Sequence, residues 1–344
     1  MKIHHKSSAA AGYRRRQRQY FLAAGILFLM AVFLAGFMLT YGKTVYSPLT
    51  VWKVLLGEQI QGASFSIRTL RLPRMLGAVL CGLAFGLAGN TFQKLLGNPL
   101  ASPDIIGISS GASVAAVFGL LVLGLDGSQV SLLAVAFGLL ISVLIYCLAR
   151  SNGFSNGKLI LTGIGVQAFL SAVLSWMLLK ASEYDVPGAL RWLSGSLNGV
   201  KMDDIPPLLA AVLLAGLSIA LLNRHLTALQ LGETYGITLG VSVNKTRLLL
   251  ICCSLILVAF ATSVSGPIAS VAFLSGPVAS KLSGEGRSNL LTSALVGAVL
   301  VLAADLAGQF AFSSRYPAGV ITGLLGAPYL LFLLLRMNRK GGPL

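Results

Sequence analysis

Long apolar runs, separated by short stretches rich in glycine, proline and charged residues, dominate this chain. Most runs have about the 20 residues that an α-helix needs to cross the hydrocarbon core of a bilayer. The pattern therefore predicts an all-α, polytopic membrane protein. We expect about ten spans, near residues 20–40, 72–93, 104–123, 128–149, 159–180, 205–223, 247–266, 268–282, 289–312 and 318–336.

Composition agrees with this interpretation. Hydrophobic residues make up 56% of the 344 positions and charged residues only 10%, whereas soluble domains usually carry about 25% charged residues. A mean hydropathy of +0.83 excludes both a soluble globule and a disordered chain. We therefore expect a basic cytoplasmic N-terminus at 1–19, a single transmembrane domain at 20–337 and a short cytoplasmic tail at 338–344.

The net charge is +16, from 26 Lys and Arg against 10 Asp and Glu. In a soluble protein such a charge suggests nucleic-acid binding. Here the basic residues lie in short loops and in one cluster before the first span, which is a positive-inside signal for a cytoplasmic N-terminus. An even number of spans returns the C-terminus to the cytoplasm. We expect contact with membrane lipid and not with nucleic acid.

The chain contains few residues that could act as nucleophiles, acids or metal ligands. Its four cysteines lie inside apolar runs, and none of its three histidines is near a cysteine in the sequence. We therefore predict no metal site, no cofactor and no catalytic residue. Residues 153–158 resemble a phosphate-binding loop only superficially, because the glycine spacing is wrong and Leu159 stands where serine or threonine is needed. The protein is expected not to be an enzyme, and ATP-driven work must come from another subunit.

Asp305 is the one carboxylate deep within a predicted span. An acid inside the membrane is a functional candidate by default. We favour a structural acid that is hydrogen-bonded to a broken helix end. The alternative is an ion-driven secondary transporter that uses Asp305 as its coupling site.

Two interrupted segments suggest internal symmetry. The stretch 97–103 follows the second span, and a glycine–proline break follows the seventh. Because the second span runs inward and the seventh outward, we expect the two halves to be inverted repeats, and matching broken segments indicate a transport pathway. Together with Asp305, the candidate pathway residues are those in and near the first break: Asn90, Gln93, Asn98, Pro99 and Ser109.

Positive charge also lies on the predicted outer side. Arg71 and Arg74 flank Pro73 at the outer end of the second span, against the usual bias toward cytoplasmic charge. They either extend to lipid headgroups or form a docking point for acidic residues of an external protein. We favour docking, because positive charge on the outer side runs against the positive-inside bias. On the same side, Pro48–Leu56 is predicted to be a short interfacial helix.

Several motifs together resemble the FecCD family. They are Arg71-Leu72-Pro73-Arg74, Gly89-Asn90-Thr91-Phe92-Gln93, the run from Asn98 to Gly107, Ser110-Gly111-Ala112, Leu231-Gly232-Glu233, Leu239-Gly240-Val241, Ala304-Asp305, Pro317-Ala318-Gly319 and Gly326-Ala327-Pro328. This family comprises the permeases of binding-protein-dependent ABC importers for iron-siderophores, haem and cobalamin. The resemblance covers about residues 20–337, and the block from 71 to 112 is highly specific.

The resemblance implies the type II ABC importer permease fold, with ten helices per subunit and a pathway at a dimer interface. It also implies two cytoplasmic ATPase subunits and an extracytoplasmic siderophore-binding protein, in a bacterial plasma (inner) membrane. The binding protein would dock on Arg71 and Arg74. The loop that couples the permease to the ATPase would contain Leu231, Gly232, Glu233, Leu239 and Gly240.

This chain departs from the family pattern at several places. Gly97 and Gln309 stand where family members commonly have arginine, and the segment 277–281 lacks the usual histidine and final arginine. Such losses suit one half of a heterodimer whose partner permease supplies the missing groups, although a homodimer stays open.

The cargo is indicated by similarity alone. The motifs at 163–166, 178–182 and 192–199 look most like those of ferric-siderophore permeases. We therefore expect import of iron(III)-siderophore complexes. The alternative is the same architecture importing haem or cobalamin.

Overall fold

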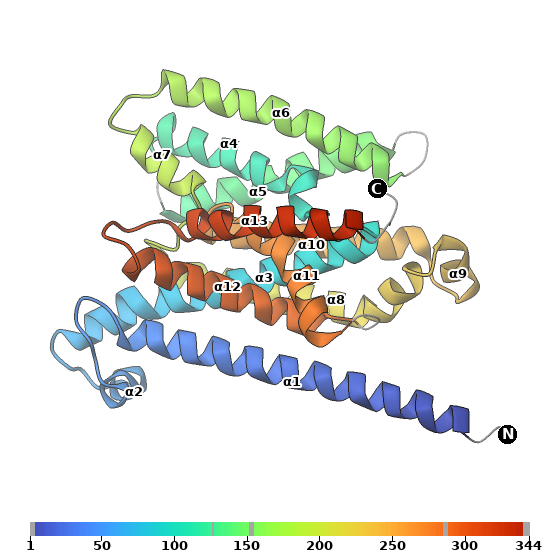
Figure 1. Ribbon diagram of the computed structural model, residues 1–344. Helices are drawn as coiled ribbons and strands as arrows, with labels where there is room; N and C mark the ends of the chain where they lie inside the picture. Colours follow the sequence, from blue (N-terminus) through green and yellow to red (C-terminus); the bar gives the residue numbers. More distant parts are fainter. Residues whose placement is uncertain (1–3, 126, 151–154, 285–287, 340–344) are drawn as a thin grey trace.

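The computed structural model describes residues 4–125, 127–150, 155–284 and 288–339. Within these ranges every regular element is a helix (Figure 1), which confirms the predicted all-α fold. The long helices are α1 (His4–Thr40), α3 (Leu72–Leu96), α4 (Ile108–Leu121), α5 (Gly127–Arg150), α6 (Asn156–Lys180), α8 (Ile205–Leu229), α10 (Val243–Ser265), α11 (Ala269–Ser283), α12 (Leu290–Phe310) and α13 (Ala318–Arg339). The short ones are α2 (Pro48–Leu56), the π-helical η1 (Phe65–Arg71), η2 (Pro103–Ile106), α7 (Val186–Leu193), η3 (Met202–Asp204) and α9 (Glu233–Thr238).

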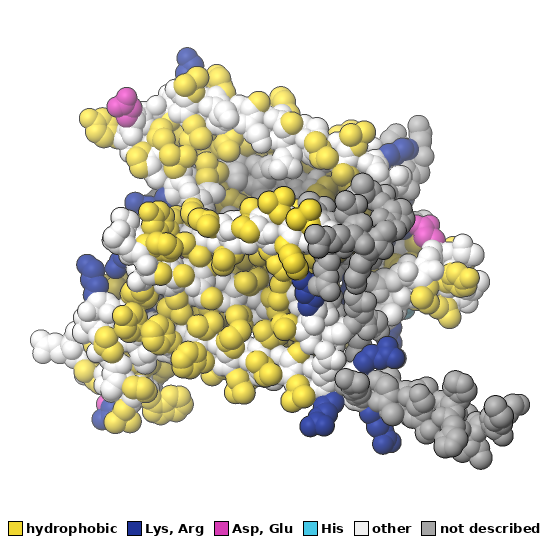
Figure 2. Space-filling model, viewed as in Figure 1, with side chains coloured by type: hydrophobic (Ala, Val, Ile, Leu, Met, Phe, Trp, Pro, Cys, Tyr) yellow, Lys and Arg dark blue, Asp and Glu magenta, His cyan; other side chains and the backbone are white. Residues whose placement is uncertain are grey.

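The helices are long and apolar enough for a multi-pass membrane protein. In the part of the chain that the structure describes, seven helical segments have the length and hydropathy of a span, and α4 and α13 contain shorter apolar helices. Figure 2 shows hydrophobic side chains over the middle of the visible face, with Lys and Arg toward its two ends. The predicted eighth span corresponds to α11, which has only 15 residues. The total of ten spans and the inverted relation of the two halves stay predictions.

Helix α3 is the centre of the bundle and packs against α8, α10, α11 and α12 (Figure 1). Glycines let the backbones approach closely, as is common where helices pack in lipid. A Cβ added at Gly82 would overlap the backbone of Ala298, and one added at Gly89 would overlap the carbonyl oxygen of Ala272.

A second group of helices lies beside this core. α4 packs against α5 and α6, and α10 connects this group to α3 because it contacts α3, α4 and α5. Helix α6 is the outermost of them (Figure 1) and leaves Leu161, Phe169, Trp176 and Leu179 exposed. Such an apolar surface is suited to lipid or to another membrane subunit.

The bundle has two ends (Figure 1). We call one the α2 end, which also carries α7, and the other the α9 end, toward which the start of α1 and the end of α13 point. The predicted short helix at Pro48–Leu56 is confirmed as α2, where the Ser47 hydroxyl accepts a hydrogen bond from the Thr50 N–H and Pro48 occupies the first turn.

Several boundaries differ from the sequence expectation, and two of them bear on the candidate sites. The second span begins earlier, because η1 continues directly into α3 and places Arg71 and Arg74 inside one long helix. Pro73 has no N–H to donate, and it lies in the first turn of α3, directly after the π-helical turn in which the Leu72 N–H donates to the carbonyl oxygen of Ile67. Helix α8 also continues to Leu229, so part of the predicted loop at 224–246 is helical.

Candidate functional site

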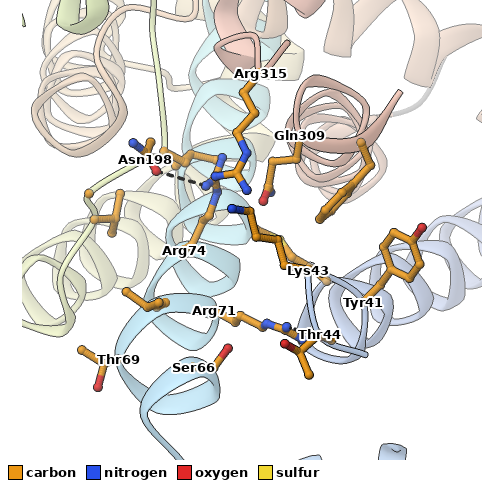
Figure 3. A pocket seen from close by; sticks show the side chains of 17 residues that line it. Tyr41, Lys43, Thr44, Ser66, Thr69, Arg71, Arg74, Asn198, Gln309 and Arg315 are labelled. Carbon is orange, nitrogen blue, oxygen red and sulfur yellow. Dashed lines mark hydrogen bonds between the residues drawn. The ribbon is translucent and has the colours of Figure 1, made fainter. Parts of the chain in front are cut away.

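A cavity of about 380 Å³ opens at the α2 end. Its wall comes from the end of α1 and the loop after it, from η1 and the start of α3, from residues 197–200, and from the end of α12 and the loop after it. Four cationic side chains line it: Lys43, Arg71, Arg74 and Arg315 (Figure 3). No Asp or Glu is among the described lining residues. We call this electropositive space the cationic cavity.

Arg71 is fixed by backbone carbonyls. Its Nη1 donates to the carbonyl oxygens of Leu39 and Thr40, both at 2.9 Å, and its Nη2 donates to that of Thr44 at 2.6 Å. Leu39 and Thr40 are the last residues of α1, where carbonyls lack intrahelical partners and the helix dipole favours a cation. The guanidinium carbon also lies 4.8 Å from the centre of the Tyr46 ring. Arg71 therefore ties the loop after α1 to the helix that carries it.

Arg74 is fixed by a carboxylate on α12. Its Nε and Nη2 donate to the two carboxylate oxygens of Asp305, at 2.9 Å and 2.8 Å. Such a bidentate pair is stronger and more specific in geometry than a single hydrogen bond. The side chains of Arg74 and Asp305 are only 17% and 2% exposed. Gln309 Nε2 donates to the same carboxylate at 2.7 Å, so the group joins α3 to α12.

The interpretation of Asp305 changes accordingly. The expected hydrogen-bond partner, a broken helix end, is wrong, because Arg74 and Gln309 donate to the carboxylate of Asp305. Arg74 and Asp305 are 231 residues apart in the sequence, and nothing in the sequence paired them. The role of Asp305 in a pathway stays a prediction.

Asn90 and Gln93 lie inside the helix packing of the subunit. They are 2% and 7% exposed. Gln93 Nε2 donates to the carbonyl oxygen of Phe273 on α11 at 2.9 Å, and the Gln93 side chain occupies the space beside Gly276. The Nδ2 of Asn90 has no hydrogen-bond partner in the described structure. Gln93 therefore faces α11, the short helix with Pro277 in its interior, and the backbone of Asn90 lies near Gly276 of the same helix.

The remaining pathway candidates lie in the turn between α3 and α4. Asn98 is exposed, and its Oδ1 accepts a hydrogen bond from the Leu100 N–H at 2.8 Å. The hydroxyls of Ser109 and Ser102 both donate to the carboxylate of Asp104.

Asn98 and its exposed neighbour Pro99 thus form a turn at the end of α3, and Ser109 holds the start of α4. The six pathway candidates fall in three separate places in the described structure. The structure does not gather them around one cavity.

The predicted coupling loop protrudes at the α9 end (Figure 1). Gly232 and Gly240 flank α9 with φ angles of 112° and 80°, which an L side chain rarely adopts. Glu233 pairs with Arg247 on α10 and thereby holds the start of α9 against that helix. Four apolar side chains of the loop are more than 60% exposed: Leu231, Tyr235, Ile237 and Leu239. Figure 2 shows this hydrophobic surface on the protruding part of the molecule.

Sequence reasoning missed Lys43 and Arg315. Each is a single exposed cation in a polar loop, and only the fold brings the two loops to one cavity. A weak signal existed, because both follow directly on predicted spans at the end where Arg71 and Arg74 lie.

A helical membrane domain with an electropositive cavity at one end and an exposed apolar loop at the other has the features of a permease subunit that works between two partner proteins. Comparison with known proteins gives the particular family. The model of the FecCD transport family matches residues 27–336, and the chain belongs to this family.

Individual relatives agree over nearly the whole chain. It is 37% identical to the ferric enterobactin transport system permease protein FepG of Escherichia coli, over 92% of this chain and 96% of that protein. It is 36% identical to the achromobactin transport system permease protein CbrC of Dickeya dadantii, over 92% and 91% of the two chains. A solved structure of an ABC transporter of the metal-chelate type, in an inward-facing conformation, is 27% identical with a TM-score of 0.78, over 91% of this chain and 98% of that chain.

These findings confirm the predicted class. The protein is a transport permease subunit of the ABC importer kind and not an enzyme. Permeases of this kind work with ATPase and binding-protein partners. The fold agrees with that of the metal-chelate transporter.

Proposed function

We propose that this chain is the permease subunit of an ATP-driven, binding-protein-dependent importer of iron(III)-siderophore complexes in a bacterial plasma (inner) membrane. The match to the FecCD family over residues 27–336 carries the proposal. Its cargo is supported by the relatives named for ferric enterobactin and achromobactin, which align over more than nine-tenths of this chain.

We further propose that the α9 end is cytoplasmic and the α2 end is external. Arg14, Arg16 and Arg18 lie exposed at the start of α1, next to its apolar span, which fits the bias of cationic residues toward the cytoplasm. This orientation puts both termini in the cytoplasm. It also puts the cationic cavity where an external binding protein would reach it.

The partners follow from this orientation. The external binding protein docks at the cavity lined by Arg71 and Arg74, and two ATPase subunits contact the loop that contains Leu231, Gly232, Glu233, Leu239 and Gly240. The exposed apolar side chains around α9 support this second contact, because docking would remove them from water. A second permease, which completes a heterodimer, covers part of the remaining apolar surface.

The cargo is tested by growth of a bacterial strain that lacks its own siderophore, haem and cobalamin permeases. Expressing this chain with candidate partner permeases, ATPases and binding proteins should restore growth on ferric siderophores but not on haem iron or cobalamin. Growth restored by haem or cobalamin alone would contradict the proposed cargo. Uptake that continues with a hydrolysis-deficient ATPase, and stops with a protonophore, would instead support an ion-driven transporter.

The coupling role predicts a specific defect for Glu233→Ala. Without the carboxylate, Arg247 no longer holds the start of α9, so ATP hydrolysis should continue while siderophore uptake falls at least about tenfold. The measurement is the ratio of uptake to ATP hydrolysis in proteoliposomes that contain the assembled importer. Glu58→Ala, which removes an exposed ion pair with Lys53 on α2, is the control and should leave this ratio unchanged. A normal ratio in Glu233→Ala would show that Glu233 has no role in coupling ATP hydrolysis to uptake.

A further inference from the structure

A groove of about 610 Å³ runs along α1 toward the α9 end of the bundle. It is lined mainly by apolar side chains between Leu22 and Met30 of α1, and by Leu282 near the end of α11. Leu22 and Met30 are exposed, whereas Leu27 is buried and forms part of the floor. We call this space the α1 groove. Helix α1 lies on the opposite side of the bundle from α6 (Figure 1), so a second permease that covers α6 leaves the groove open to lipid.

The α1 groove has about the length of one lipid leaflet. Four of its lining residues follow one another at intervals of four positions and are therefore neighbours along the helix surface: Arg18, Leu22, Ile26 and Met30. From Arg18 to Met30 the helix rises about 18 Å, at about 1.5 Å per residue. Half of a hydrocarbon core of about 30 Å is about 15 Å. One acyl chain of a single leaflet therefore fits along the groove, with its headgroup at the level of Arg18.

The headgroup end of the α1 groove is positively charged. Arg18 is exposed there and has no hydrogen bond or ion pair within the described residues. Arg14, one helical turn earlier, is also exposed, and no Asp or Glu is among the described residues that line the groove. Figure 2 shows Lys and Arg side chains where α1 leaves the hydrophobic middle of the molecule. A free guanidinium beside an apolar groove complements a lipid phosphate, because basic pockets between membrane helices bind anionic headgroups.

We propose that the α1 groove binds one anionic phospholipid, with its phosphate against Arg18 and an acyl chain along Leu22 and Met30. The lipid lies where α1 meets the end of α11. There Gln19 Nε2 donates to the carbonyl oxygen of Leu282 at 3.4 Å, which is longer than the usual range of about 2.7–3.2 Å. Because this polar contact between the two helices is weak, the bound lipid stabilises the position of α1 against α11. The site goes beyond the proposed function and does not depend on the cargo.

The test measures lipid binding to the purified full-length permease by native mass spectrometry. The probes are phosphatidylglycerol and phosphatidylcholine with identical acyl chains. The wild type should bind one phosphatidylglycerol about fivefold more tightly than phosphatidylcholine, which is the effect expected of one basic residue at anionic headgroups. Arg18→Gln should remove most of this preference, and Arg18→Lys, which keeps the charge, should retain it. Because Arg18 is exposed, neither substitution should prevent folding.

Arg16→Gln is the matched control. Arg16 is exposed near the same end of α1, but it lies two residues from Arg18, on a different face of the helix, and does not line the groove. This variant should keep the preference for phosphatidylglycerol. An equal loss in Arg16→Gln and Arg18→Gln would reveal diffuse attraction to the basic end of α1 and overturn the site, as would equal binding of the two lipids by the wild type. Displacement of phosphatidylglycerol by excess inorganic phosphate would assign Arg18 to a free anion and overturn the lipid site as well.

Discussion

Replacing Asp305 with alanine will destabilise the permease by about 3–5 kcal/mol, because the change leaves the largely buried Arg74 guanidinium without its carboxylate. The group also loses the hydrogen bond from Gln309, so the connection between α3 and α12 at the α2 end is broken. The measurement is the thermal unfolding midpoint of the purified permease in detergent, followed by loss of monodispersity on heating.

A matched control separates burial from charge. Glu58→Ala removes an ion pair whose side chains are 47% and 56% exposed, and such pairs contribute only about 0–1 kcal/mol. The double variant Arg74→Met with Asp305→Leu replaces both partners with apolar groups and should recover most of the lost stability. If Asp305→Ala unfolds at the same temperature as Glu58→Ala, the pair does not hold α3 to α12.

Substituting Gly89 with valine will prevent the bundle from assembling normally. Even the first carbon of a side chain would overlap the carbonyl oxygen of Ala272, which belongs to the backbone of α11 and cannot rotate away. Overpacking of a well-packed core typically costs about 1–3 kcal/mol and sometimes more. We expect little monodisperse protein from membranes and a clearly lower unfolding temperature for the fraction that is recovered.

Gly36→Val is the matched control for this prediction. Gly36 lies within the span of α1, and a Cβ there would meet nothing within 4 Å. Its yield and unfolding temperature should stay close to the wild type. Normal yield and stability of Gly89→Val would show that α3 and α11 are farther apart than the structure places them.

Much of the architecture could be predicted from the sequence, because membrane helices are set by local patterns. The run of apolar residues fixes each span, and Ser47 followed by Pro48 marks the start of α2. Arg71 and Arg74 also stood out, since positive charge was unexpected on their side of the membrane. Local pattern and residue type were enough for these conclusions.

The partners of those arginines could not be predicted. Asp305 lies on α12, far along the chain from Arg74, and the carbonyls that hold Arg71 belong to a backbone with no sequence signature. Lys43 and Arg315 were missed for the same reason. The sequence around a single cation in a loop does not show whether its side chain faces water or a cavity. Tertiary packing alone decides which charges are paired and which are free.

The glycine contacts of α3 constrain how this subunit can change shape. At these glycines the backbones are in direct contact, and a movement that brought a larger residue of either helix into the contact would clash, so we expect α3, α11 and α12 to move as one block. Helices α4, α5 and α6 are joined to that block mainly through α10. A transport cycle in this subunit is therefore expected to proceed by rigid-body rocking of one block against the other, with the joint along α10.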